Sequence, residues 1–197
     1  MGGSIVQPPN YLTTQLPNQP MRIINLTESK SMIYSSNAYL ILGDWNALDD
    51  ANTLVDVGND PTAIEKIRQI ATGVGKKAIE QVIITHGHFD HTGILPQMRQ
   101  AFAPLVYAQS TFVGPDIVME DGARIKCGDR TFEVIYTPGH SDDSICLYCQ
   151  TDGALFVGDT PVVIRSNQQT YDARFVNALE QLCHKDVHAI YFGHGEP

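Results

Sequence analysis

The chain has 197 residues, 43% of them hydrophobic, and its 22 acidic and 13 basic side chains give a formal net charge of −9. This length suits one domain with a substantial core, and an acidic chain without clustered lysine and arginine is not typical of nucleic-acid binding. No apolar run approaches the roughly 20 residues that span a bilayer, and no basic region followed by an apolar core begins the chain. We therefore expect a cytoplasmic protein with no nucleic-acid and no membrane partner.

The amino-terminal part is predicted to change from an irregular lead-in to a series of short strands. Residues 1–20 carry several prolines and amides, so we expect a poorly ordered or surface-running segment there and place the domain itself at residues 21–197. Strands are expected at residues 21–25, 37–42 and 53–57.

A helix is predicted to begin at residue 60 or 61. Asp60 and Pro61 are typical of a helix start, with Asp60 as the cap, and isoleucines at helical spacing follow until the glycines at 73–75. The elements predicted beyond this helix are a strand at 81–85, a helix marked by Ile94, Met98 and Phe102, and a strand at 105–108.

From residue 116 onward, short strands are separated by glycine-bearing turns. Strand–helix alternation mixed with such runs of strands indicates an α/β or α+β layered fold rather than a simple βαβ array. The elements predicted here are strands at 124–126, 132–136, 144–149 and 154–157, a helix at 172–184 and a last strand at 189–192.

Two of the four cysteines form a CxxC pattern, which is found in redox and zinc sites. Cys146 and Cys149 lie in a strand-like segment, and residues three apart on a strand face opposite sides. We therefore expect structural, reduced thiols, which fit a cytoplasmic setting.

Residues 85–93 hold three histidines and an aspartate, directly after an apolar strand-like run. His86, His88, Asp90 and His91 are all metal ligands by type. A divalent cation removes the repulsion among crowded imidazoles, because it requires neutral histidine and charged carboxylate. The stretch therefore predicts a metal site, and the alternative is a solvated histidine-rich loop.

Polar residues also follow four other predicted strands. Because open sheets bind their ligands at the carboxyl ends of strands, we expect these residues to converge with the histidine-rich stretch. They are Asp56, His140, Asp159 and His194. The two remaining histidines, His184 and His188, lie near the end of a predicted helix and are assigned no role.

These motifs, and the order in which they follow one another along the chain, resemble those of the metallo-β-lactamase superfamily of metal-dependent hydrolases. The resemblance runs from about residue 23 to the end, and implies an α+β fold: an αβ/βα four-layer sandwich, with two mixed sheets flanked by helices and the metals at one rim. It rests on the aspartate in 55–58, the HxHxDH motif at 86–91, and the segments 137–141, 158–160 and 193–195.

The resemblance also implies two divalent metal ions, zinc by expectation, with iron or manganese as alternatives. The implied ligands are His86, His88 and His140 for one ion and Asp90, His91 and His194 for the other, with Asp159 bridging the pair. Asp56 is expected to accept hydrogen bonds that orient the loop. Asp90, or a metal-bound water, is expected to protonate the leaving group.

The implied reaction is attack of a hydroxide, held by both metals, on the carbonyl of a small-molecule substrate. Asp159 resembles the thioesterase, lactonase, phosphodiesterase and ribonuclease branches, whereas true β-lactamases usually carry Cys or Ser there. Nucleases favour basic surface, and glyoxalase II adds a carboxyl-terminal domain where this sequence stops at Pro197. We therefore expect a hydrolase of a small thioester, ester or lactone, with a phosphodiesterase as an alternative.

Three further interpretations concern the scaffold. The main alternative to the hydrolase is a mononuclear iron oxidoreductase similar to persulfide dioxygenases, because the residue types that bind its iron overlap with those of the hydrolase site. A flavodiiron protein normally has a carboxylate where His88 stands, and an inactive scaffold is disfavoured because no ligand position is lost.

Two features beyond the ligands remain open. Tyr171 follows Asp159 in a loop that could overhang the site, where its phenol would stabilise an oxyanion or simply pack. Family members normally continue with another helix, and a subunit partner in a homo-oligomer could cover the surface that such a helix would protect.

Overall fold

The computed structural model describes residues 20–27, 33–73, 75–162 and 173–195 and contains two β-sheets. The first sheet has six strands in sequence order, antiparallel from β1 to β3 and parallel from β3 to β6. Its strands are β1 (Arg22–Asn25), β2 (Tyr39–Leu42), β3 (Thr53–Val55), β4 (Gln81–Ile84), β5 (Leu105–Ala108) and β6 (Ile117–Val118).

The second sheet has five strands in the order β11-β10-β9-β8-β7. Its neighbouring strands are antiparallel except for β10 and β11, which are parallel, so both sheets are mixed. Its strands are β7 (Arg124–Cys127), β8 (Arg130–Tyr136), β9 (Ile145–Cys149), β10 (Ala154–Gly158) and β11 (Ala189–Phe192).

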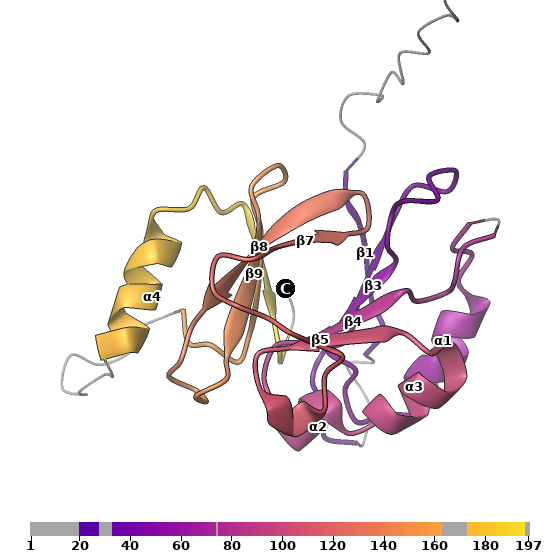
Figure 1. Cartoon of the computed structure of the whole chain (residues 1–197), viewed down its shortest axis with the longest axis horizontal. Helices are drawn as coiled ribbons and strands as arrows, with labels where there is room; N and C mark the ends of the chain where they lie inside the picture. Colours follow the sequence, from indigo (N-terminus) through magenta and orange to yellow (C-terminus); the bar gives the residue numbers. More distant parts are fainter. Residues whose placement is uncertain (1–19, 28–32, 74, 163–172, 196–197) are drawn as a thin grey trace, which may run out of the picture.

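Helices cover the outer faces of the two sheets, as Figure 1 shows. Ile67 of α1 and Met98 of α3 are fully buried against the first sheet, and Leu182 of α4 packs against the second. Between the sheets lies a third cluster that includes Phe132 and Phe156, each of which contributes about 2 kcal/mol by its burial. The order helix, sheet, sheet, helix confirms the predicted αβ/βα sandwich. The helices are α1 (Thr62–Gln69), α2 (Phe89–Thr92), α3 (Leu95–Phe102) and α4 (Ala173–Cys183), with a 3₁₀ turn η1 (Thr111–Val113).

Several predicted boundaries differ from the structure. The first helix begins at Thr62, with Pro61 at the N-cap position, while the Asp60 carboxylate accepts a hydrogen bond from the Thr62 N–H. This helix ends at Gln69 rather than near the glycines at 73–75, because the backbone of Ile70 is already extended. Two short elements, α2 and β6, were not predicted. The lead-in, up to residue 19, and Tyr171 lie outside the described residues.

The strand β9 places its two cysteines on opposite faces, as predicted. Cys146 belongs to the cluster beneath α4, and Cys149 to the cluster between the sheets. All four cysteines are free thiols, and among them Cys183 is exposed. Burial raises the pKa of Cys146 to about 11 and that of Cys127 to about 12.

Thiol labelling should therefore distinguish Cys183 from the other three cysteines. Because the thiolate is the reactive form, we expect an aromatic disulfide reagent to modify one thiol per folded chain at about pH 8 and all four in denaturant. Cys183→Ser should remove the rapid reaction. Rapid modification of Cys146 or Cys149 in the folded protein would contradict the burial described above.

Within the described ranges, the structure contains no helix that is both long enough and apolar enough to cross a membrane.

Candidate metal centre

The segments that follow β4, β8, β10 and β11 bring together seven side chains that can donate to a metal, and two of them, Asp90 and His91, lie in α2. Within each of two groups, the donor atoms lie within 4.8 Å of one another. The first of these segments extends from the first sheet and the other three from the second, so the groups form only in the folded chain. The groups are His86, His88 and His140, and Asp90, His91, Asp159 and His194. All seven ligand positions predicted from the sequence are therefore close together.

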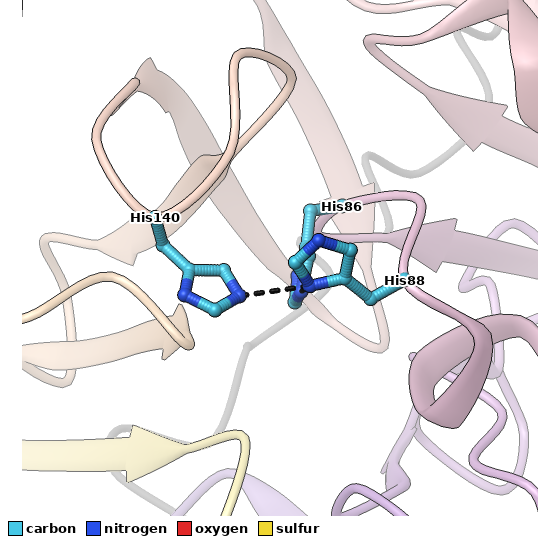
Figure 2. A group of neighbouring side chains, drawn as sticks. All are labelled: His86, His88 and His140. Atoms are coloured by element: carbon cyan, nitrogen blue, oxygen red, sulfur yellow. Dashed lines mark hydrogen bonds between the residues drawn. The ribbon is translucent and has the colours of Figure 1, made fainter.

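Three imidazoles form the first group, which Figure 2 shows converging from two loops. His88 Nδ1 lies 3.0 Å from His86 Nε2 and 2.9 Å from His140 Nε2. Burial lowers the pKa of His86 to about 4, helped by the positive charge of His91, and burial also lowers the pKa of His140. Both rings are therefore neutral near pH 7 and can offer lone pairs to a cation.

Two carboxylates and two imidazoles form the second group. His91 Nε2 lies 3.3 Å from an Asp159 oxygen and 3.8 Å from an Asp90 oxygen. His194 Nε2 lies 3.0 Å from the same Asp90 oxygen. Both Nε2 atoms are buried, and despite these neighbouring oxygens neither forms a hydrogen bond of acceptable geometry. A buried polar atom without a partner costs about 1–3 kcal/mol, and a divalent cation would provide that partner.

The Asp159 carboxylate lies between the two groups. One oxygen is 3.6 Å from His140 Nε2 in the first group and 3.4 Å from His194 Nε2 in the second, and the other oxygen faces His91. Burial favours the neutral acid, but the nearby positive charge of His91, whose Nε2 lies 3.3 Å away, outweighs it and lowers the pKa of Asp159 to about 2. An ionised carboxylate is thus placed where it can contact two cations.

Asp56 lies behind the ligands rather than among them. It follows β3 with a positive φ of 54°, and its Oδ1 accepts from the Thr85 N–H at 2.8 Å. Its Oδ2 accepts from the Thr85 hydroxyl and lies 2.8 Å from His91 Nδ1. A carboxylate at Nδ1 requires a ring proton there, so in the neutral ring that a cation would bind, the Nε2 lone pair faces the second group.

His91 is fully buried and titrates unusually. Burial disfavours its charged form, but Asp56 and Asp159 outweigh that cost and raise its pKa to about 10. Without a metal, a proton therefore supplies the positive charge that the surrounding carboxylates require. A cation at Nε2 would displace this proton, so metal uptake by the second group should release one.

Gly193 permits the close approach of β11 to the second group. A Cβ at this position would lie 2.1 Å from an Asp159 oxygen and 2.8 Å from a carbon of the His91 ring. Any side chain here would displace a ligand, so the glycine before His194 is a requirement of the site.

The segment before β2 contributes residues that the sequence did not single out. Asn37 donates from its backbone N–H to the Gly193 carbonyl at 2.6 Å, and its side-chain amide reaches the Phe192 and Gly195 carbonyls at 2.9 and 2.8 Å. The Ser36 N–H donates to the Asp90 carbonyl at 3.0 Å. The loops of two ligands are thus anchored by one segment far away in sequence.

Exposed aromatic side chains lie beside the second donor group. The Tyr34 ring, in a residue that is 66% exposed, stacks on His194 with centroids 5.4 Å apart and lies 6.2 Å from Phe89, which is 63% exposed. Gly87, which lies between two histidines of the first group, lines an open groove of about 330 Å³ together with Phe112 and Val113. Apolar surface therefore adjoins both donor groups.

His184 and His188 belong to neither donor group. Both are exposed, and the absence of a role for them stays a prediction.

One protein family and several known proteins are similar to this chain in sequence. A sequence profile described as "Metallo-beta-lactamase superfamily" matches residues 33–111 and 104–163. A hydroxyacylglutathione hydrolase of Francisella tularensis subsp. novicida is 36% identical over 88 residues, which are 43% of this chain and 35% of that protein. An atrochrysone carboxyl ACP thioesterase of Aspergillus fumigatus is 25% identical over 179 residues, 89% of this chain and 55% of that protein. The chain thus spans between about a third and just over half of these relatives.

Solved structures show the same fold. ETHE1 from Myxococcus xanthus superposes with a TM-score of 0.66 at 23% identity, covering 90% of this chain and 76% of that one. The BLEG-1 B3 metallo-β-lactamase gives a TM-score of 0.61 at 24% identity, covering 90% and 92%. At these identities the likeness concerns the fold alone.

Proposed function

Because the chain belongs to the metallo-β-lactamase superfamily, we propose that it is a hydrolase that uses two zinc ions to cleave a small thioester, ester or lactone. The observation that carries this proposal is the position of Asp159, whose oxygens lie 3.3–3.6 Å from histidines of both donor groups. Two relatives named as a hydrolase of hydroxyacylglutathione and as a thioesterase support the thioester as the preferred substrate class.

The residues of the site fit the chemistry that such cations supply. When bound, divalent ions lower the pKa of water and polarise a carbonyl oxygen. Neutral His86 and His140 and ionised Asp159 are in the protonation states that cation binding requires. The Asp90 oxygen 3.0 Å from His194 Nε2 is our candidate for passing a proton to the leaving group.

The surface beside the ligands favours an apolar acyl group. Tyr34 and Phe89 present largely exposed rings next to His194. Arg99, which also lines the groove, is 3.0 Å from an Asp116 oxygen and donates to the Gly114 carbonyl, so its charge is already paired. This surface offers little positive charge to bind a phosphodiester. We therefore favour an acyl hydrolase over a phosphodiesterase.

Tyr34→Ala should therefore raise KM for benzoyl or long-chain acyl thioesters by about tenfold, because a stacking aromatic contact and its apolar area are lost. For an acetyl thioester the change should stay within about twofold, since a methyl group buries little area. Tyr34→Phe, which keeps the ring, is the matched control. Equal effects of Tyr34→Ala on both substrates would show that the ring does not contact the acyl group.

A mononuclear iron oxidoreductase is the second candidate. The three-histidine group, which could hold a single cation by itself, favours it. The buried, unbonded Nε2 atoms of His91 and His194 favour a second cation instead. The two proposals therefore differ in whether the second donor group is occupied.

Hydrolysis by metal-free and reloaded protein tests the proposed function. The protein should be stripped with a chelator, reloaded with zinc, iron or manganese, and assayed against thioesters, lactones and a phosphodiester. We expect zinc to restore thioester or lactone hydrolysis. Absence of acyl hydrolysis with every metal, or restoration for the phosphodiester alone, would overturn the proposal.

We further propose a cytoplasmic protein that acts on a small molecule. Free thiols at all four cysteines fit a reducing compartment. The net charge of −9 supports the absence of a nucleic-acid partner.

A further inference from the structure

Asp143 connects the two loops that carry the three-histidine group. Its Oδ2 accepts a hydrogen bond of 2.8 Å from the N–H of Gly87, the residue between His86 and His88. Its Oδ1 accepts a hydrogen bond of 2.7 Å from the hydroxyl of Ser141, the residue after His140. One carboxylate thus holds a position next to each of the three imidazoles.

These loops extend from different sheets, so their relative position has to be maintained across the interface. The Gly87 loop follows β4 of the first sheet, and the Ser141 loop joins β8 to β9 of the second. A backbone hydrogen bond of 2.9 Å from the Ile145 N–H to the Thr85 carbonyl also joins them. That bond lies on the buried side, whereas Gly87, His88 and His140 are exposed and have less packing to hold them.

We infer that Asp143 is a positioning residue that preorganises His86, His88 and His140 for one cation. This inference rests on the proposed metal centre. Residues that orient metal ligands typically change metal affinity by about 10–100-fold when they are removed. The Gly87 contact is close, since a Cβ on this glycine would lie 3.0 Å from Asp143 Oδ2.

The neighbouring Asp142 provides a matched control. Its side chain is 89% exposed and pairs with Arg174 at 3.2 Å instead of with the histidine-rich loop. Asp142→Ala removes the same charge from the same loop without removing a bond to Gly87. Asp143→Asn provides the conservative variant, because an amide oxygen can accept from the Gly87 N–H while the Ser141 hydroxyl accepts from the amide nitrogen.

Zinc affinity tests the inference in a His194→Ala background, which removes a donor only from the second group. Competition with a chromophoric chelator then reports mainly on the three-histidine group. Asp143→Ala should weaken zinc binding by about 10–100-fold. Asp143→Asn and Asp142→Ala should stay within about threefold of the parent. The inference would be overturned if Asp143→Ala bound zinc within about threefold of the parent affinity. It would also be overturned if Asp143→Asn bound zinc as weakly as Asp143→Ala.

Amide hydrogen exchange at Gly87 provides a readout without metal or turnover. The Gly87 N–H should exchange slowly in the parent, in Asp143→Asn and in Asp142→Ala, and faster in Asp143→Ala. If Asp143→Ala fails to fold, the comparison of Asp143→Asn with the parent still decides, since fast exchange in Asp143→Asn would contradict the proposed contact. If the unmodified protein binds no metal, the proposed function fails; if only the Asp143 effect is missing, this inference fails alone.

Discussion

Asp159→Ala should lower kcat/KM for a thioester or lactone by at least about a thousandfold, because the carboxylate that reaches both donor groups is lost and with it several kcal/mol of metal-derived stabilisation. His88→Ala should have a comparable effect through the first group, whose two other imidazoles lie 3.0 and 2.9 Å from the His88 ring. Steady-state assays combined with metal quantification would measure both losses.

Both variants should remain folded. The His88 side chain is exposed and Asp159 is only partly buried, so circular dichroism and thermal unfolding should show the native fold. His184→Ala is the matched control, since this histidine lies outside both donor groups, and it should retain full activity. Normal turnover by Asp159→Ala or His88→Ala would remove that residue from the proposed site.

Asp56→Asn should leave the protein folded but empty the second donor group. Asparagine tolerates the positive φ of 54° at this position, and its oxygen can still accept from the Thr85 N–H. Its amide nitrogen, however, would face His91 Nδ1, where the carboxylate oxygen now lies at 2.8 Å. The His91 ring would then carry its proton on Nε2, where it blocks the lone pair that a cation needs.

The expected result is the loss of one metal ion per chain and a fall in kcat/KM of about a hundredfold or more. Nitrogen chemical shifts of the His91 ring would report the tautomer directly, independently of turnover. Asp56→Ala should be less stable than Asp56→Asn, because alanine at a positive φ is strained and leaves the Thr85 N–H without its acceptor. Full metal content in Asp56→Asn would contradict the assigned tautomer.

The convergence of the candidate donors could be predicted from the sequence because they follow apolar strands. Val82–Ile84 and Ile190–Phe192 are short apolar runs that end in histidine motifs, and the carboxyl ends of strands converge at one rim of the fold. The layered fold followed from the same alternation of strands and helices. The CxxC pair was also predicted to be structural, from the alternation of side chains along one strand.

Other features depend on contacts that no local pattern reveals. α2 has four residues, fewer than the two turns that a helical period needs. Asn37 and Asp143 act on loops 155 and 56 residues away in sequence, so only the packed structure identifies them. Tyr34 likewise reaches His194 from the opposite end of the chain, and nothing in its neighbouring residues indicates a role at the site.

Metal analysis of protein made in defined medium, with zinc, iron and manganese quantified together, tests the central claim most directly. We predict about two zinc ions per chain, together with hydrolysis of an acyl thioester or lactone by the same preparation. One iron ion per chain with consumption of oxygen and no acyl hydrolysis would contradict it.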